Sequence, residues 1–243
     1  MNKLKVGVIF GGMSTEHDVS ISSGTSIIKN LSKEKYEILP IYISEDGSWY
    51  KYTKNIEEIE ALHVGDKITE LEKIENEFEY LKSLDVAFPV LHGLYGEDGT
   101  IQGFMETINM PYVGAGVLAS ANAMDKIMTK YLLQTVGIPQ VPFVPVLRSD
   151  WKGNPKEVFE KCEGSLIYPV FVKPANMGSS VGISKAENRE ELQEALEEAF
   201  RYDARAIVEQ GIEAREIEVA ILGNEDVRTT LPGEVVKDVA FYD

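Results

Sequence analysis

The stretch that decides the fold is Lys5–Gly12, which reads KVGVIFGG. It is a short, nearly uninterrupted apolar run that ends in two glycines, a pattern typical of a strand buried in a parallel sheet. The next segment opens with Thr15 and Asp18 at the spacing of a capping box. It continues with apolar residues at helical spacing, which are Gly24, Ile27, Ile28 and Leu31. With a second apolar run at residues 38–43, the sequence predicts a strand, helix and strand unit.

The segment up to residue 114 extends this unit. Residues 44–82 are charge-rich and weakly periodic, with a turn predicted at Asp46-Gly47 and a short edge strand at residues 49–52. Residues 85–91 predict another buried strand that runs into a glycine-rich loop, followed by a helix from about Ile101 and a strand around residues 112–113. Open α/β sheets bind ligands at the carboxyl ends of their strands. Gly11-Gly12 and His92-Gly93 both lie at such ends.

A second, smaller α+β unit is predicted from the remaining sequence. A strong amphipathic pattern predicts one helix over residues 120–136, stopped by Gly137. Strands at residues 141–147 and 168–173 enclose a helix opened by Pro155, and a helix at residues 189–202 leads to a strand at residues 206–210. After Glu216, residues 217–221 alternate as a strand that turns at Gly223 toward strand-like residues 227–243.

Composition limits the classes of partner. The chain has 24 Lys and Arg against 40 Asp and Glu, a formal net charge of −16, so we expect no nucleic-acid partner. No apolar run is long enough for a membrane span and no signal peptide opens the chain, so we expect a cytoplasmic protein without a membrane partner. Cys162 is the single cysteine of the sequence, which excludes an internal disulfide. Its Glu-Lys-Cys-Glu setting predicts a place on the polar side of a helix. Neither zinc-ligand spacing nor a nucleophile elbow is present.

A nucleotide site without the usual fingerprints is suggested by the second half of the chain. The sequence contains neither G-x-G-x-x-G after its first strand nor a P-loop. Lys173 ends an apolar strand and is followed by a glycine- and serine-rich segment that could surround phosphates, although an ordinary connection has the same composition. Lys126 could help to hold the anionic nucleotide, or it could be a lysine that faces solvent from a helix. Glu209 and Glu216 could accept hydrogen bonds from an adenine amino group or a ribose, or be exposed strand carboxylates.

Two polar residues at the ligand edge of the first sheet have two interpretations each. Glu16 stands where a carboxylate could bind an ammonium group, and it also suits the N-terminus of a helix electrostatically. His92 could donate to a substrate carboxylate or be a loop histidine without function.

Taken together and in order, these segments resemble the D-alanine:D-alanine ligases of the ATP-grasp superfamily. The matching text is VIFGGMSTEHDVS at residues 8–20, LHG at 91–93, GTIQG at 99–103, PYVG at 111–114, MDK at 124–126, the segment 172–182, and AFYD at 240–243. The resemblance implies an N-terminal open parallel-sheet α/β domain that binds substrate (1–114). A central ATP-grasp nucleotide-binding domain (115–212) and the start of a C-terminal catalytic domain (213–243) follow it.

The resemblance also implies the chemistry and the residues that perform it. ATP phosphorylates the carboxylate of one D-alanine, and the amine of a second D-alanine displaces phosphate to give a dipeptide for peptidoglycan synthesis. Glu16 and Ser179 are implied as catalytic residues that hold the first ammonium, with His92 near its carboxylate. The implied ATP-binding residues are Lys126, Lys173, Asn176, Met177, Gly178, Ser179, Ser180, Val181, Gly182, Glu209, Gln210, Gly211, Ile212 and Glu216. Mg²⁺ or Mn²⁺ as a cofactor and a homodimer are implied as well.

One part of the family's pattern has no counterpart in this sequence. The family continues through a loop with a Lys and a Tyr, a catalytic Arg, and the Asp, Glu and Asn that hold magnesium. We therefore expect the chain to be C-terminally incomplete and inactive as given, with its metal ligands beyond residue 243. A D-alanine:D-serine ligase is the close alternative, and a nucleotide- or amino-acid-binding fragment without turnover is the alternative from another class.

Overall fold

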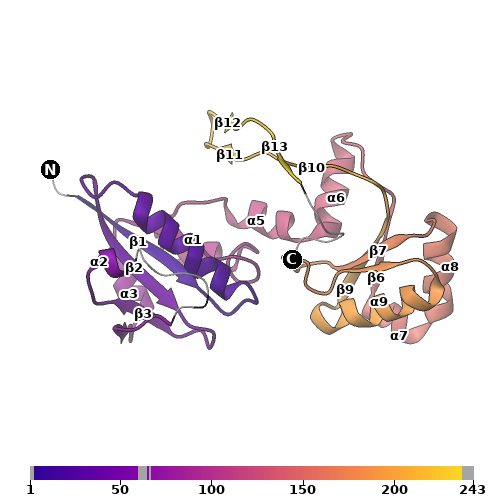
Figure 1. Ribbon diagram of the computed structural model, residues 1–243, viewed down its shortest axis with the longest axis horizontal. Coiled ribbons are helices and arrows are strands. Elements are labelled where there is room, and N and C mark those ends of the chain that lie inside the picture. The colour runs from indigo at the N-terminus through magenta and orange to yellow at the C-terminus, as the bar shows by residue number, and fades with distance from the viewer. Residues whose placement is uncertain (1–2, 60–64, 66, 237–243) are drawn as a thin grey trace. The chain divides into compact units, whose positions relative to one another are not determined.

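The computed structural model describes residues 3–59, 65 and 67–236, which form two compact units. The first unit comprises Met1–Gln140 with Ala175–Gly178, and the second comprises Val141–Pro174 with Ser179–Asp243. Figure 1 labels their elements. The described residues include no helix that is long and apolar enough to cross a membrane.

The sheet of the first unit is mixed. Its strands follow the order β4-β3-β2-β1-β5, with bounds Leu71–Lys73, Trp49–Tyr52, Tyr36–Ile43, Leu4–Gly11 and Val86–Pro89. β1 pairs in parallel with β2 and β5, which confirms the predicted parallel layer around Lys5–Gly12. β3 and β4 are antiparallel additions, because the Asp46-Gly47 turn folds the chain straight back after β2. The prediction of β3 as an edge strand was wrong, since β4 pairs with its outer side.

Both faces of this sheet are buried, because helices pack on each of them. α1 (His17–Asn30) covers the face to which Val6, Val8 and Phe10 point. α3 (Glu77–Lys82) and α4 (Thr100–Thr107) contribute to the cluster around Ile9 on the other face, and α2 (Ile56–Ile59) adds Ile59 to the α1 side. The near-continuous apolar run of β1 is explained by this burial on both sides.

Two local predictions in the first unit need correction. Thr15 and Asp18 form no capping box, because Glu16 is the N-cap of α1 and makes no side-chain cap bond. Residues 112–113 form an isolated bridge between Tyr112 and Ala87 rather than a strand, because the chain leaves the sheet at Gly114.

The single helix predicted for residues 120–136 is two helices, α5 (Val117–Met124) and α6 (Lys126–Thr135). Asp125 separates them with an extended backbone (ψ 104°), and its carboxylate accepts hydrogen bonds from the amides of Ile127 and Met128. The apolar periodicity runs across this break, which is why the sequence pattern concealed it. Gly137 ends α6 in a left-handed conformation (φ 76°), as predicted.

The second unit is built on an antiparallel sheet with the order β6-β9-β7-β8. Its strands are Phe143–Leu147, Arg205–Gln210, Val170–Pro174 and Ser184–Ala186, and its helices α7, α8 and α9 are Arg148–Gly153, Pro155–Ser165 and Arg189–Tyr202. Sheet and helices share one apolar core. The predicted helices at Pro155 and at residues 189–202 are confirmed, and both begin after an asparagine whose side chain caps them.

Cys162 does not lie on a polar helix side. It is 2 % exposed, because α8 turns Val158 and Cys162, one helical turn apart, into the core while the neighbouring charged residues point outward. Burial raises the pKa of its thiol to about 11.

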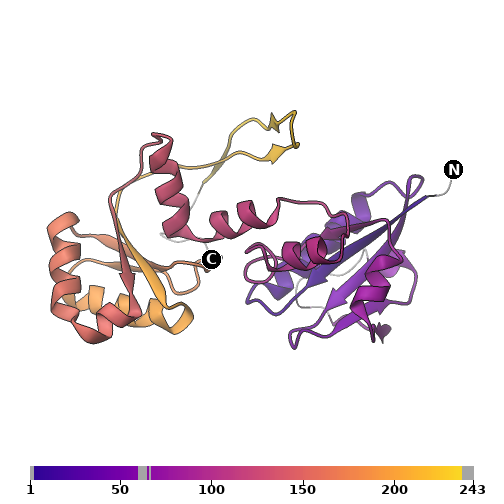
Figure 2. The same ribbon diagram turned by 180° about the vertical axis from the view of Figure 1, so that it is seen from behind.

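The segment after β9 extends away from the four-stranded sheet as an arm of two short ladders (Figures 1 and 2). β10 (Glu216–Glu218) pairs with β13 (Gly233–Val235), and β11 (Ile221–Leu222) pairs with β12 (Arg228–Thr229). The continuous strand predicted for residues 217–221 is thus interrupted at Val219 and Ala220. Residues 227–243 were predicted as strand-like, and within their described part, residues 227–236, the strands are β12 and β13. The matching segment at 240–243 lies outside the described residues.

Candidate functional site

The carboxyl ends of β1 and β5 are fixed to each other by one buried hydroxyl. Ser20 is fully buried, and its Oγ accepts a hydrogen bond from the Gly11 amide (2.9 Å) and donates one to the Val90 carbonyl (2.5 Å). These bonds satisfy the last amide of one strand and a carbonyl just beyond the other. The loops that follow the two strands therefore start from one rigid base.

The same two loops meet again at Ser14. Its Oγ donates to the His92 carbonyl at 2.7 Å, and the Glu16 amide donates to Ser14 Oγ at 3.2 Å. His17, which is buried, lies with Nδ1 2.6 Å from the Gly12 carbonyl and Nε2 3.1 Å from the Tyr42 hydroxyl. The position of Glu16 is thus set by bonds on either side of it.

The Glu16 carboxylate lies so close to the backbone of Gly93 and Gly178 that neither position has room for a side chain. A Cβ on Gly93 would overlap Glu16 Oε2, and a Cβ on Gly178 would lie 2.9 Å from the same oxygen. Gly93 also has φ 70°, which favours glycine. The structure therefore brings Glu16, the His92 loop and the start of the predicted phosphate loop together within the first unit.

His92 is held between a hydroxyl and a carboxylate. Its Nε2 lies 2.8 Å from Ser23 Oγ, and its Nδ1 lies 3.6 Å from Glu97 Oε1. The Glu97 carboxylate raises the pKa of His92 above its ordinary 6.5, and the pKa of Glu97 is lowered in return. Glu97 also accepts a hydrogen bond from the Gly93 amide at 2.8 Å. Glu97 was not predicted as a site residue, although its place in the glycine-rich loop could have marked it.

Lys126 is the first residue of α6 and faces residues 175–178 rather than solvent alone. Its amide donates to the Ala175 carbonyl at 3.0 Å, and its Nζ donates to the Met177 carbonyl. Asn176 lies between these two contacts. Within the first unit, Lys126 thus supports the backbone of the predicted phosphate loop.

A cavity of about 640 Å³ in the second unit collects most of the remaining predicted nucleotide residues. Lys173 and Glu209 form an ion pair across it, with Nζ 2.6 Å from Oε2, and their side chains are 28 % and 9 % exposed. They are diagonal neighbours, since β7 and β9 pair antiparallel with Phe171 opposite Glu209. The predicted residues that line the cavity are Lys173, Ser180, Glu209, Gln210, Ile212 and Glu216.

Gln210 lines the cavity, but its side-chain amide is used for structure. Oε1 accepts from the Ile167 amide at 2.8 Å, and Nε2 donates to the Ile167 carbonyl at 2.7 Å. Gly211 is pressed against the Pro169 backbone, where a Cβ would lie 2.5 Å from the carbonyl oxygen. The backbone of these two residues, rather than the Gln210 amide, is therefore what could contact a ligand.

The loop that follows Gly178 has a constrained backbone. Ser179 and Ser180 have φ 44° and 59°, and Gly182, after Val181, has φ 69°. A Cβ on Gly182 would lie 2.6 Å from Tyr202 Cδ2 and 2.8 Å from Pro174 Cγ. Left-handed conformations at residues other than glycine cost about 1–3 kcal/mol and cluster at functional sites.

Two charged residues of the cavity were missed. Arg215 donates two hydrogen bonds of 2.7 Å to the Glu234 carboxylate, joining the start of the arm to β13. Only the pairing of β10 with β13 brings them together, so no local sequence signal could have found them. Among the described residues, no group of three or more His, Cys, Asp or Glu side chains could hold a metal ion.

Comparison with protein families gives two consecutive matches, separated by residues 116–131. Residues 5–115 match the family model described as D-ala D-ala ligase N-terminus, and residues 132–243 match D-ala D-ala ligase C-terminus. Together they cover all but short segments of the chain.

Individual relatives agree with these matches. A D-alanine–D-alanine ligase of Enterococcus faecalis is 70 % identical over 99 % of this chain, which covers 72 % of that protein. The crystal structure of the VanG D-Ala:D-Ser ligase of Enterococcus faecalis has a TM-score of 0.86 at 35 % identity, with 100 % of this chain and 72 % of that chain covered. The D-alanine-D-alanine ligase of Coxiella burnetii has a TM-score of 0.80 at 34 % identity, with 96 % and 71 % covered. This chain belongs to the D-alanine–D-alanine ligase family.

Proposed function

We propose that the protein is an ATP-dependent ligase that joins two D-alanines into D-alanyl-D-alanine, in the cytoplasm, as a precursor for peptidoglycan. The observation that carries this proposal is the 70 % identity with the Enterococcus faecalis D-alanine–D-alanine ligase over 99 % of the chain. We also propose a division into a substrate-binding part (1–114), a nucleotide-binding part (115–212) and the beginning of a catalytic part (213–243), and a homodimer.

In this proposal the first D-alanine binds where the β1 and β5 loops meet. Glu16 accepts hydrogen bonds from its ammonium, assisted by Ser179, and His92 donates to its carboxylate. The geometry supports this assignment, because Glu16 lies beside Gly93 and the raised pKa of His92 favours its cationic form. An anionic and a cationic side chain on adjoining loops suit a zwitterion, which carries both charges.

The nucleotide is proposed to bind in the cavity around Lys173 and Glu209. The groups present fit ATP: Glu209 can accept from an adenine amino group, Glu216 from ribose hydroxyls, and Phe171 and Ile212 offer apolar contact. Lys173 and Lys126 neutralise phosphate charge, and backbone amides of residues 176–182 donate to phosphate oxygens. Gln210 and Gly211 contribute their backbone.

The reaction that follows is a phosphoryl transfer and an acyl transfer. A carboxylate oxygen of the first D-alanine bonds to the γ-phosphorus as the bond to the β-phosphate oxygen breaks, releasing ADP. The amine of the second D-alanine then bonds to the carbonyl carbon, loses a proton, and phosphate leaves. In such transfers a protein acts mainly by positioning and charge neutralisation, the roles assigned here to Glu16, His92 and Lys173. Mg²⁺ or Mn²⁺ is proposed to supply further positive charge when bound with ATP.

D-alanine:D-serine ligation is the second candidate, favoured by the TM-score of 0.86 with the VanG ligase. The test is to incubate the full-length gene product with ATP, Mg²⁺ and D-alanine, with or without D-serine, and to measure ADP and the dipeptide by mass spectrometry. We expect D-alanyl-D-alanine to form with one ADP per dipeptide. Preferential formation of D-alanyl-D-serine from the mixture would support the second candidate, and ATP consumption without dipeptide would contradict both.

A further inference from the structure

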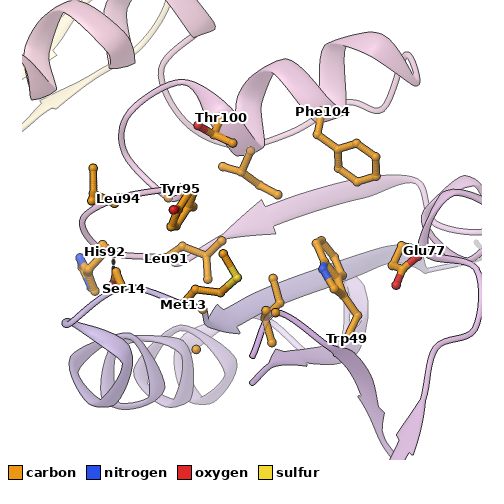
Figure 3. A pocket seen from close by; sticks show the side chains of 16 residues that line it. Met13, Ser14, Trp49, Glu77, Leu91, His92, Leu94, Tyr95, Thr100 and Phe104 are labelled. Carbon is orange, nitrogen blue, oxygen red and sulfur yellow. Dashed lines mark hydrogen bonds between the residues drawn. The ribbon is translucent and has the colours of Figure 1, made fainter. Parts of the chain in front are cut away.

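A separate cavity of about 330 Å³ lies in the first unit, on the face of the sheet opposite α1 (Figure 3). Figure 3 shows Phe104 entering from α4 and Trp49 from β3 on the other side, with Met13 and Leu91 between the strand ends. Its volume is within the range of small-molecule sites. Glu16 does not line it. The Ser14–His92 hydrogen bond lies at its boundary with the loops proposed to hold D-alanine.

The walls of this cavity suit a flat aromatic ligand. Trp49 and Phe104 meet edge to face with ring centroids 6.2 Å apart and planes at 67°. Tyr95 and Met13, on the loops, are 47 % and 46 % exposed, so a ligand between them would remove apolar surface from water. Aromatic rings and a thioether make favourable contacts with a further aromatic ring.

The acidic residue that lines the cavity favours a ligand with a positive charge. Of the described residues that line it, Glu77 is the only carboxylate, and the described residues give it no ion-pair partner. In Figure 3 Glu77 lies beside Trp49, at the end away from His92. A cation placed there would meet both a carboxylate and an indole ring, and the net charge of −16 attracts it further.

We propose that this cavity binds a small aromatic cation of the arylalkylamine class, with its ring against the Trp49–Phe104 pair and its ammonium at Glu77. The proposed ligand contacts, which are Trp49, Phe104 and Glu77, include no residue assigned to the ligase reaction; His92 lines the cavity at its other end.

The test uses tryptamine as the cationic probe, 3-ethylindole as the neutral one and indole-3-propionate as the anionic one. The chain contains two tryptophans, Trp49 and Trp151, so its ¹⁵N-labelled form has two indole N–H signals. We expect tryptamine to shift the Trp49 signal saturably and to leave that of the buried Trp151 unchanged. Calorimetry should give tryptamine an affinity at least about tenfold above that of indole-3-propionate.

Variants locate the two ends of the ligand. Glu77→Gln should remove the preference for tryptamine over 3-ethylindole, whereas Glu79→Gln, on the same helix but outside the cavity, should keep it. Phe104→Ala should weaken all indole probes, whereas Phe78→Ala should not. Because Glu77 is near the surface, its variant remains informative even if Phe104→Ala fails to fold. An unshifted Trp49 signal, or an anionic probe that binds as tightly as tryptamine, would overturn the proposal.

Discussion

Replacing Lys173 by alanine tests the proposed nucleotide site most directly. The Lys173 ammonium lies 2.6 Å from Glu209 in a partly buried pair, on the wall of the 640 Å³ cavity. Removing Lys173 deletes one positive charge. It also leaves the nearly buried Glu209 carboxylate, beside the proposed nucleotide site, without the neutralising ammonium of Lys173. Both effects disfavour a polyanion.

The magnitude follows from the geometry. A hydrogen bond to a charged group contributes about 1.5–3 kcal/mol. The lysine is 28 % exposed and already bound to Glu209, so the lower end applies. About 1.5 kcal/mol corresponds to about tenfold in affinity. Repulsion between Glu209 and the phosphates adds to this loss, which makes tenfold a minimum.

The assay is calorimetric titration of ATP into the parent chain and into Lys173→Ala. Lys185→Ala is the matched control, because Lys185 lies on the neighbouring strand β8, forms an exposed ion pair with Glu187, and does not line the cavity. We expect the control to bind ATP like the parent, and thermal unfolding to show that both variants are folded. A folded Lys173→Ala chain with the parent's ATP affinity would refute the assignment of Lys173 to the nucleotide.

Three further outcomes are expected. Glu16→Gln in the full-length gene product should raise the KM for the first D-alanine at least about tenfold in steady-state kinetics, because a charge-assisted bond is lost; an unchanged KM would leave Glu16 only its favourable place at the N-terminus of α1. The pKa of His92, followed by NMR, should lie above 6.5 and fall in Glu97→Gln. The pair's contribution to stability is complete between pH 4.5 and pH 6.5, the ordinary pKa values of the two groups, and it is lost as pH rises through the raised pKa of His92 or falls through the lowered pKa of Glu97. A Glu97→Gln chain with the same thermal stability profile would contradict this. Cys162, with its pKa of about 11 against an ordinary 9.0, should react with iodoacetamide at pH 8 at least about 100-fold more slowly in the folded chain than in urea, and equal rates would show that the thiol is accessible.

Sequence patterns predicted the elements whose signals are local. β1 follows from an apolar run, and α9 from its periodicity. β4, with the sequence LEK, has no such signal and exists because β3 supplies hydrogen bonds to it. The break at Asp125 was missed because the apolar residues keep helical spacing across it, while one carboxylate side chain redirects the backbone.

The candidate site shows the same division. Lys173 and Glu209 could be marked from sequence as charged residues at strand ends, but their ion pair depends on the β7–β9 register, which joins residues far apart in the chain. The contact of Glu16 with Gly178 likewise depends on a non-local approach of two loops. The hydrogen bonds from the Gln210 side chain to the backbone of Ile167 could not be predicted, because a side-chain amide can bond to a ligand or to the protein backbone equally well.

The Ser20 hydroxyl has a consequence for how mutations in this gene will be interpreted. It never reaches solvent, and it is proposed to touch no ligand, yet it sets the common starting point of the two loops that carry Glu16 and His92. Alanine at this position removes the partner of the buried Gly11 amide, at about 1–3 kcal/mol, and also that of the partly buried Val90 carbonyl. In a growth-based mutational scan, Ser20 will therefore be as intolerant as a residue that binds substrate. In such a scan, variants are depleted at residues that hold the binding loops in place as strongly as at residues that bind the substrate.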